Sequence, residues 1–374
     1  MKRNMIKLGD VATYINGYAF KPEDRGEVGL PIIRIQDLTG NAYDLGFYNG
    51  DYPKRIEIND GDVLISWSAS LGVYVWNRGR ALLNQHIFKV QFDKVNIDKS
   101  YFVYAVRQKL AEMAMKTHGA TMKHIVKKDF EETLIPYPSL KKQIEIGTNL
   151  DKIDNIIVAR KQQLELLDEL VKARFVELFG DAIYNDKGWE NDTVEKLCKE
   201  IYGGGTPSKS HPEYYEDGDI PWVSSKDMKT DVLTDSQIKI NQLGVDNSTA
   251  RMVPINSVIM VIRSGILKHT LPVAINAVPI TVNQDLKVFI PNKRVLTRFL
   301  AIQFKMHEKD ILSGVRAVTA DNIEFNSLKQ RELIVPPIEL QQEYVTFLEQ
   351  IDKSKVSLYY KNRKGGFSAI IVYI

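Results

Sequence analysis

The sequence contains two long stretches in which short apolar runs alternate with turn-forming residues. Residues 1–140 include the runs "PIIRI", "DVLIS" and "IFKVQF", and residues 181–337 include "IPWVS", "SVIMVI" and "LKVFI". Because glycine, asparagine, aspartate and proline separate these runs, the pattern predicts short strands in an irregular mixed sheet within each stretch. Apolar residues at helical spacing also predict one helix over residues 99–116 and another over residues 295–313.

Residues 141–180 show a different pattern, in which apolar residues recur in alternating steps of three and four. This spacing predicts one long helix whose apolar seam is filled at two positions by Arg160 and Arg174. About 38 residues at 1.5 Å each give it a length of roughly 57 Å. A rod of that length favours a spacer between two domains, paired with a shorter helix over residues 338–361. The alternative is that each helix only caps its own domain. The seam residues expected to pair the helices are Leu150, Ile153, Ile157, Leu164, Leu167, Val171, Leu348 and Ile351.

The two stretches are copies of one plan. Four blocks recur in the same order: residues 30–40 match 220–230, 61–72 match 256–267, 83–90 match 282–289, and 118–143 match 316–341. A repeat of nearly 200 residues is a whole domain with its following helix rather than a solenoid unit. The predicted fold class is therefore α+β, with two domains of mixed, mainly β structure, residues 1–140 and 181–337, separated by spacer helices.

Composition narrows the class of protein. The chain has 374 residues and a net charge of only +3, so any binding of DNA requires a local basic patch or a larger assembly. Its single cysteine, Cys198, excludes a disulfide framework and fits a reducing cytosol. We expect no signal peptide and no membrane span, since neither an apolar leader nor a long apolar run is present, and we expect a cytoplasmic protein.

Motifs of catalysis are missing. The sequence has no Asn-Pro-Pro-Tyr or Asp-Pro-Pro-Tyr tetrapeptide of amino-methyltransferases, no dinucleotide-binding glycine pattern and no histidine spacing for zinc. The stretch "IYGGGTPSKS" (201–210) comes close to a P-loop, but Ser208 replaces the second glycine and Pro207 removes an N–H donor. We therefore expect no catalytic residue, no metal site and no cofactor held by this chain.

The last repeated block carries a motif of the form G-A-T-x-K-x-I, followed by Phe, (I/L)-P-x-P-x-L-x-x-Q and an Ile-Asp pair. Residues 119–154 contain this motif almost fully, and residues 317–352 contain a looser copy. In this motif, and in its repeated order of domain and helix, the chain resembles the specificity subunits of type I restriction–modification systems. The resemblance covers roughly residues 1–358.

The resemblance implies a non-catalytic subunit that gives a larger complex its DNA sequence specificity. Each copy would be a target recognition domain that reads one half of a bipartite, asymmetric double-stranded DNA target. The long helices would pack as an antiparallel coiled coil and fix the gap between the halves. Two methyltransferase subunits and the translocase–endonuclease subunits would be the partners, and these would hold S-adenosylmethionine and ATP.

Polar side chains on the repeated loops are the candidates for contact with DNA, because bases and phosphates are read by such groups. Trp67 and Trp222, each in a predicted strand, are instead interpreted as core residues. The glycines of "IYGGGTPSKS" are interpreted as giving freedom for close approach to DNA. The candidates are Tyr18, Lys21, Ser66, Ser68, Thr121, Lys123 and His124 in the first copy, and Thr206, Ser208, Lys209, Arg263, Ser264, Lys268 and Arg316 in the second.

Residues 362–374 depart from the family pattern. Gly365 and Gly366 interrupt the second helix, and "AIIVYI" is an apolar, strand-like segment. This predicts an incomplete helix pair, which puts the docking of the second methyltransferase subunit in doubt and allows self-association. Two other functions remain open, namely a coiled-coil adaptor without DNA specificity and the recognition half of a self-contained methyltransferase–nuclease.

Overall fold

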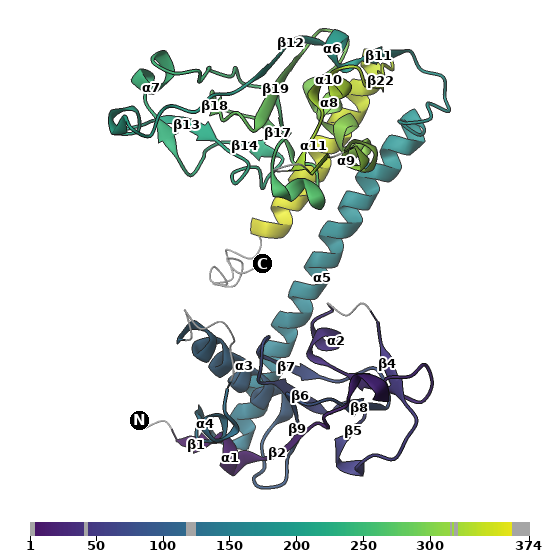
Figure 1. Ribbon diagram of the computed structural model, residues 1–374, viewed down its shortest axis with the longest axis vertical. Helices are drawn as coiled ribbons and strands as arrows, with labels where there is room; N and C mark the ends of the chain where they lie inside the picture. The colour runs from purple at the N-terminus through teal and green to yellow at the C-terminus, as the bar shows by residue number, and fades with distance from the viewer. Residues whose placement is uncertain (1–3, 41–43, 117–124, 315, 318–320, 361–374) are drawn as a thin grey trace. The chain divides into compact units, whose positions relative to one another are not determined.

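The computed structural model describes residues 4–40, 44–116, 125–314, 316–317 and 321–360 (Figure 1). The chain forms two compact units, unit 1 (Met1–Ala159) and unit 2 (Arg160–Ile374). The division falls inside the longest helix, α5 (Leu140–Phe179), so each unit contains one end of it. Each unit combines short strands with helices, and the α+β class is confirmed.

Unit 1 is built on two four-stranded sheets. The first has the order β2-β9-β6-β7 (Thr13–Asn16, Ile87–Gln91, Val63–Ser66, Gly72–Val75), and all its strand pairs are antiparallel. The second has the order β4-β3-β8-β5 (Gly46–Tyr48, Leu30–Ile33, Ala81–Leu83, Glu57–Ile58), in which β3 and β8 are parallel. The apolar runs of the sequence thus form these strands, and Leu64 and Phe88 are buried in two separate core clusters.

Short elements close unit 1. Strand β1 (Met5–Lys7) pairs with β10 (Leu134–Pro136), so the start of the unit is tied to the segment just before α5. The helices before α5 are α1 (Leu8–Val11), α2 (Ile35–Thr39), α3 (Lys99–Lys116) and α4 (Lys127–Glu131). Helix α3 begins and ends where the apolar spacing predicts.

Unit 2 repeats the plan with a larger sheet. Its sheets have the orders β12-β19-β16-β17-β14 (Cys198–Gly203, Leu286–Pro291, Val258–Val261, Val273–Asn276, Val232–Leu233) and β15-β13-β18 (Lys239–Ile240, Ile220–Val223, Thr281–Val282). Two strand pairs, β11 (Asn191–Thr193) with β22 (Glu332–Ile334) and β20 (Arg316–Ala317) with β21 (Asp321–Asn322), complete it. Phe289 and Val258 lie in one core that also contains Phe175 and Phe179 of α5.

The helices of unit 2 differ from the prediction in one place. They are α6 (Val194–Leu197), α7 (Gln242–Asp246), α8 (Thr297–Met306), α9 (Glu308–Ser313), α10 (Phe325–Lys329) and α11 (Ile338–Tyr360). The single helix predicted over residues 295–313 is thus two helices, because His307 between them has a ψ of 5° and leaves helical geometry. Its ring is buried, and periodicity alone does not reveal this break.

The "P-x-P-x-L-x-x-Q" motif explains how each unit joins its long helix. Gln143 and Gln341 are both fully buried. The Gln143 carbonyl accepts from the Asp98 N–H at 3.0 Å, and its amide donates to the Pro138 carbonyl at 2.8 Å. Gln341 does the same with the Leu296 N–H (2.9 Å) and the Pro336 carbonyl (2.9 Å). Each glutamine therefore ties the proline turn before one helix to the segment before another.

The paired helices contact each other within unit 2. The Tyr344 hydroxyl of α11 donates to the Val171 carbonyl of α5 at 3.0 Å, and Lys355 Nζ lies 2.5 Å from an oxygen of Asp168. Of the predicted seam, Val171 and Leu348 pack in the unit 2 core and Ile351 is buried. The remaining seam residues are half-buried, namely Leu150, Ile153, Ile157, Leu164 and Leu167. A coiled coil along the whole of α5 stays a prediction.

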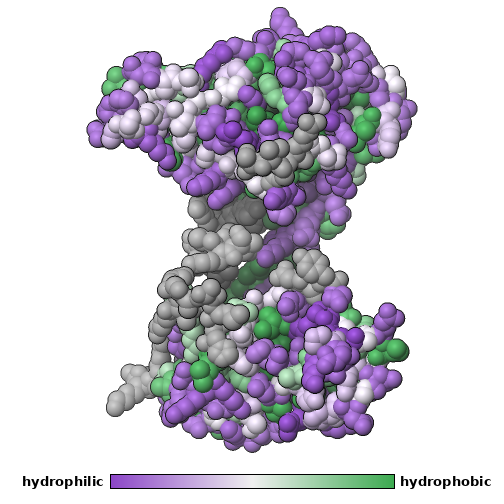
Figure 2. All heavy atoms as spheres, viewed as in Figure 1, coloured by the Kyte–Doolittle hydropathy of each residue, from purple (hydrophilic) through white to green (hydrophobic). Residues whose placement is uncertain are grey.

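The predicted bounds of the two spacer helices agree closely with those of α5 and α11. Residues 141–180 and 338–361 were the predicted spacer helices, and the helices run Leu140–Phe179 and Ile338–Tyr360. The predicted tail, residues 362–374, lies outside the described residues. The face shown in Figure 2 is mainly hydrophilic over both units, with smaller apolar patches, as the low net charge and mixed composition lead one to expect.

Candidate nucleic-acid interface

In unit 2 the backbone gathers the candidate loops around the turn between β18 and β19. The Gly205 N–H donates to the Val282 carbonyl at 3.0 Å, which fixes the "GGGTPSKS" loop beside this turn. The Ile262 N–H donates to the Asp285 carbonyl at 2.9 Å, and the Ile323 N–H donates to the Ile262 carbonyl at 2.9 Å. The Gly205 loop and the Ile262 segment therefore meet at the Asn283-Gln284-Asp285 turn, and the Ile323 segment joins them through Ile262.

Unit 1 uses the same hydrogen bonds at the matching positions. The Tyr18 N–H donates to the Leu83 carbonyl at 2.8 Å, which places the "INGYAF" loop beside Asn84-Gln85-His86. The Trp67 N–H donates to the His86 carbonyl (3.2 Å), and the Ile125 N–H donates to the Trp67 carbonyl (2.9 Å). The alignment of blocks in the sequence is thus reproduced bond by bond. We call each gathered set of loops the loop edge of its unit.

The glycines of these loops have a structural role. A Cβ atom at Gly204 would lie 1.8 Å from the Val282 carbonyl oxygen, and one at Gly17 would lie 2.0 Å from the Asn84 carbonyl oxygen. No residue other than glycine can stand at so close an approach of two backbone segments. Gly204 and Gly17 therefore serve a close approach to the protein's own turn, and a role of the loop glycines in approaching DNA stays a prediction.

The loop of unit 2 also lacks the other half of a P-loop. It leads into a three-residue 3₁₀ turn, Pro212–Tyr214, and not into an α-helix whose N–H groups could surround a phosphate. The indole N–H of buried Trp222 donates to the Gly205 carbonyl at 2.9 Å and holds the loop from inside. Trp222 and Trp67 both lie among core residues, as predicted.

Arg263 is the most strongly held candidate of unit 2. Its Nε donates to Asp285 Oδ1 at 2.7 Å, and its Nη2 lies 2.6 Å from the same oxygen. Asp285 is itself held, because the Asn283 amide donates to its second oxygen at 3.1 Å. About half of the Arg263 side chain remains exposed (49%). A surface arginine is thus fixed in one orientation, with exposed surface left for a ligand.

The other candidates of unit 2 lie on the same edge. Thr206 forms a hydrogen bond with the exposed Gln284, Ser208 with Ser210, and Ser264 accepts from the Ile266 N–H at the start of the 3₁₀ turn Gly265–Lys268. Lys209 and Lys268 are exposed. The loop edge of unit 2 therefore presents cations, an amide and hydroxyls together, which are the groups that contact bases and phosphates.

Unit 1 presents fewer of its predicted residues. Tyr18 and Lys21 are exposed, at 45% for Tyr18 and 74% for the Lys21 side chain. Ser66 has no exposed surface and donates to the Ser70 carbonyl at 2.5 Å, and Ser68 is also buried. These two serines therefore shape the loop, and the prediction that they face DNA is corrected. Ser66 is the last residue of β6, whose four residues are all buried, and Ser68 follows two positions later.

Four candidates cannot be placed by their side chains. Thr121, Lys123 and His124 lie outside the described residues. Arg316 begins strand β20, where it pairs with Asn322, and its side chain is not described. The residues that the sequence reasoning missed are those of the central turns, Asn283, Gln284 and Asp285 with Asn84, Gln85 and His86. The repeated "NQ" of the third matching block was the signal that could have found them.

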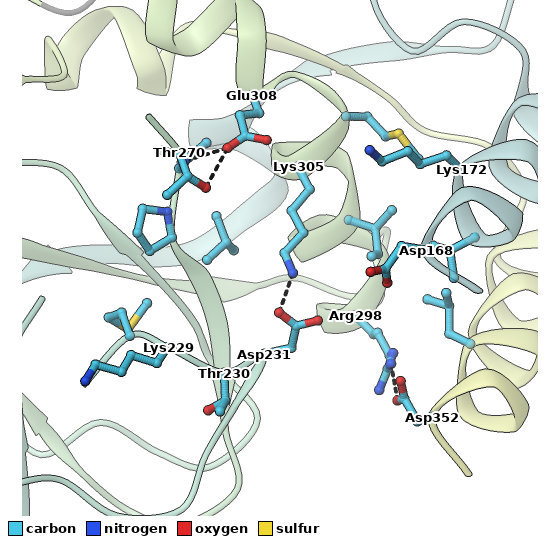
Figure 3. A pocket seen from close by; sticks show the side chains of 18 of the residues that line it. Asp168, Lys172, Lys229, Thr230, Asp231, Thr270, Arg298, Lys305, Glu308 and Asp352 are labelled. Atoms are coloured by element: carbon cyan, nitrogen blue, oxygen red, sulfur yellow. Dashed lines mark hydrogen bonds and ion pairs between the residues drawn. The ribbon is translucent and has the colours of Figure 1, made fainter. Parts of the chain in front are cut away.

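A cavity of about 670 Å³ in unit 2 is a different kind of feature (Figure 3). Its charged side chains pair across elements: Lys305 with Asp231 at 2.5 Å, Lys355 with Asp168 at 2.5 Å, and Arg298 with Asp352. Glu308 accepts from Thr270 at 2.9 Å. These ion pairs connect α5, α8 and α11 with one another and connect α8 with the loop before β14. The cavity therefore lies where charged side chains hold the helices to the sheet of unit 2.

The structure can be searched for side chains that would hold a metal ion. Among these residues, no group of three or more histidine, cysteine, aspartate or glutamate side chains could hold a metal ion. Burial raises the pKa of the Cys198 thiol to about 12, so it is not a ready nucleophile. Within the same residues, no helix is both long and apolar enough to cross a membrane.

Comparison with known proteins agrees with this architecture. The family described as type I restriction modification DNA specificity domain matches residues 2–167 and again residues 186–363. The EcoR124I/EcoR124II specificity subunit of Escherichia coli is 32% identical over 58% of this chain, a match that spans only 53% of that relative. The EcoBI specificity subunit of Escherichia coli (22% identical) and the MjaIX specificity subunit of Methanocaldococcus jannaschii (23%) match 92% and 88% of this chain, and 78% and 85% of their own.

Solved structures support the fold. The type I restriction–modification S subunit from M. genitalium superposes with a TM-score of 0.58 at 14% identity, over 97% of this chain and 95% of its own. A structure from a study of complex assembly and conformational transition in the type I R-M system gives a TM-score of 0.53 at 15% identity, over 97% and 93%. The loop edge and the arrangement of strands recur in both units, in agreement with the two family matches. The chain therefore belongs to the type I restriction modification DNA specificity domain family and carries that domain twice.

Proposed function

We propose that this chain gives a type I restriction–modification complex its DNA sequence specificity, with each unit reading one half of a bipartite, asymmetric target. One observation carries the proposal. Both units gather the same loops with the same backbone hydrogen bonds, while the side chains displayed there differ. Arg263 and Asp285 in unit 2 stand where unit 1 has Ser68 and His86. A shared frame with different side chains is what two readers of different sequences require.

The chemistry of the loop edges suits this task. Arginine and glutamine read guanine and adenine edges, lysine and backbone N–H groups contact phosphates, and the low net charge of +3 confines the attraction to local patches. Gln85 and Gln284 are exposed at the same position of the two edges. Each unit therefore offers a small set of base-reading groups on a frame fixed by its own backbone.

We assign the catalytic steps to partner subunits. In this proposal two methyltransferase subunits dock on the chain and hold S-adenosylmethionine, and translocase–endonuclease subunits hold ATP. Helix α5, at 40 residues, sets the distance between the two half-targets. The chain itself is not an enzyme in this scheme. The missing methyltransferase tetrapeptide in the sequence supports that division of labour.

The proposal is tested by selection of randomised DNA duplexes with the chain bound to its methyltransferase partner. We expect one motif of two short specified halves separated by a fixed gap. An affinity that does not depend on sequence, together with no fall in affinity as salt rises, would instead support a coiled-coil adaptor. Methylation of DNA by the purified chain with S-adenosylmethionine alone would support a self-contained enzyme.

Self-association through the helices is a further proposal. Leu166 (61% exposed) and Leu170 (47% exposed) lie one turn apart on the half of α5 in unit 2, so an apolar stripe is open to a partner. Sedimentation of the chain with and without the methyltransferase subunits tests it. We expect dimers of the free chain that dissociate when the methyltransferase binds, and a free chain that sediments as a monomer at all concentrations would refute the idea.

A further inference from the structure

We propose that Arg263, held by Asp285, reads a guanine in the half-target of unit 2, and that the matching position of unit 1 has no such reader. The inference rests on the proposed function and adds to it a base, a reading residue and a positioning residue. It is carried by the contacts around Arg263, by the exposure of its side chain, and by the comparison with the equivalent position of unit 1.

The geometry of the ion pair leaves the base-reading end of the guanidinium available. Asp285 Oδ1 engages Nε at 2.7 Å and Nη2 at 2.6 Å, on one side of the group. An arginine has five N–H donors, so Nη1 and Nη2 still carry N–H bonds that Asp285 does not use. Two such parallel donors match the O6 and N7 acceptors that guanine alone presents together in the major groove.

The Arg263–Asp285 ion pair also lowers the entropic cost of binding a base. A free arginine side chain loses about 2 kcal/mol of rotamer entropy when it is ordered. Here the Arg263 backbone N–H donates to the Asp285 carbonyl at 3.3 Å, and the carboxylate fixes the side chain from the same residue. Asn283, which is buried, accepts from the Asp285 N–H and donates to its carboxylate, both at 3.1 Å. The orientation of Arg263 is therefore set before DNA arrives.

Unit 1 lacks this arrangement at the equivalent place. Ser68 replaces Arg263 and is buried, and His86 replaces Asp285. The His86 ring packs edge-on against Trp67 with the ring centroids 4.9 Å apart. Two aromatic rings packed in this way offer no pair of parallel donors. The guanine read by Arg263 should therefore belong to one half of the target only.

The test is the selection of randomised duplexes with the full chain in complex with its methyltransferase partner, for wild type, Arg263→Ala, Arg263→Lys and Asp285→Asn. We expect Arg263→Ala to reduce the preference for guanine at one position of one half by about 5- to 100-fold and to leave every other position unchanged. Arg263→Lys and Asp285→Asn should weaken the same preference less. Arg80→Ala is the matched control, because Arg80 is an exposed arginine of unit 1 whose Nε donates to Glu57 at 2.9 Å.

A second measurement changes the DNA, so that its first arm uses the wild-type chain alone. Replacing the selected guanine with 7-deazaguanine removes the N7 acceptor, which should weaken binding by wild type and leave binding by Arg263→Ala unchanged. An equal loss of affinity on all sequences in Arg263→Ala would make Arg263 a phosphate contact and overturn the inference. So would an intact guanine preference or a motif without guanine in the affected half. If wild type selects no motif at all, the proposed function itself fails, and the inference falls with it.

Discussion

At the scale of single residues, the two buried glutamines show how a short motif becomes structure. Gln143 and Gln341 use both ends of the amide, one to accept from a backbone N–H and the other to donate to a proline carbonyl. Without the two glutamine side chains, these backbone N–H and carbonyl groups would be buried and unpaired. A buried polar group without a partner costs about 1–3 kcal/mol, so in this chain the two glutamines contribute to stability.

Replacing Gln341 with methionine should keep the volume and remove these bonds. We expect the free energy of unfolding to fall by about 2–4 kcal/mol, because the Leu296 N–H and the Pro336 carbonyl lose their partner. Urea unfolding followed by circular dichroism measures the change. Gln342→Met is the matched control, since Gln342 is the exposed neighbour, and it should change stability by less than about 0.5 kcal/mol. Equal losses in the two variants would contradict the assignment.

His307 gives unit 2 a predictable response to acid. Burial lowers the pKa of His307 below its ordinary 6.5, and the nearby Arg331 lowers it further, while Asp310 and Asp181 oppose the shift. A depressed pKa means that the unfolded chain takes up the proton first. Stability should therefore be complete above pH 6.5 and decline as the pH falls from 6.5 toward the lower, folded-state pKa.

The measurement is the free energy of unfolding between pH 7.5 and 5 for wild type and His307→Gln. The wild-type slope should exceed that of the variant by up to about 1.4 kcal/mol per pH unit, the limit for one proton. Gln342→Met, which changes an exposed side chain of the same unit and no titratable group, should leave the slope unaltered. Parallel curves for wild type and His307→Gln would show that another group controls the acid response.

Residue roles could be predicted only where sequence position fixes them. Trp222 was assigned to the core correctly, because an aromatic residue in a strand has few other places to be. Ser66 was assigned to DNA, but it is buried, since a small hydroxyl in a strand is equally at home inside when a carbonyl is near. Asp285 was missed because its role depends on Arg263, 22 positions away. A local sequence pattern does not reveal contacts between residues that are far apart in the chain.

At the scale of elements, the loop edge depends on the close packing of backbone against backbone. The strands supply only short pairings, four residues in β6 and four in β16, and the loops beyond them are held by single hydrogen bonds between segments. Gly17 and Gly204 make those bonds possible, because a side chain would separate the two backbones. The same spacing that holds the loop therefore also positions the side chains that it displays.

Gly204→Ala tests this directly. An added Cβ at 1.8 Å from the Val282 carbonyl must push the loop away, and we expect a loss of about 1–3 kcal/mol in stability together with weaker DNA binding by unit 2. Thermal unfolding and a binding titration measure the two effects. Gly265→Ala is the control, because a Cβ there meets nothing within 4 Å and no positive φ opposes it. A Gly204→Ala protein as stable as Gly265→Ala would refute the packing argument.

Elements were predictable where the pattern was long. Helix α3 spans the same residues, 99–116, that its apolar spacing indicates, and the long helix α5 differs from its predicted bounds by one residue at each end. The break between α8 and α9 was not predictable, because His307 leaves helical geometry for tertiary reasons. The short apolar runs indicate strands but not their register, which the matching hydrogen bonds within each unit show to be the same.

At the scale of the whole molecule, the charge is nearly balanced while the proposed function requires attraction to DNA. A net charge of +3 over 374 residues provides little long-range field, so phosphate binding must come from a few placed cations. Lys209 is one candidate, since it is exposed on the loop edge of unit 2. Each cation that neutralises a phosphate adds to the dependence of affinity on salt.

Lys209→Ala should weaken DNA binding alike on all sequences and reduce the slope of log K against log salt by about 1. The measurement is a titration of DNA with the methyltransferase-bound chain at several salt concentrations. Lys199→Ala is the control, because Lys199 is equally exposed on β12 of the same unit, toward the end of that strand away from the loop. An unchanged affinity and slope in Lys209→Ala would remove this lysine from the DNA contacts.

The division of the chain inside α5 also sets an order of events during synthesis. Unit 1 is one uninterrupted segment and has all its own contacts once residue 159 has left the ribosome. Unit 2 must wait, because Tyr344, which packs on Phe175 and Phe179, comes 173 positions after Val171. At 5–20 residues per second that interval is roughly 9 to 35 s. During it the side chains of Phe175 and Phe179 lack the ring of Tyr344 that covers them in the folded unit.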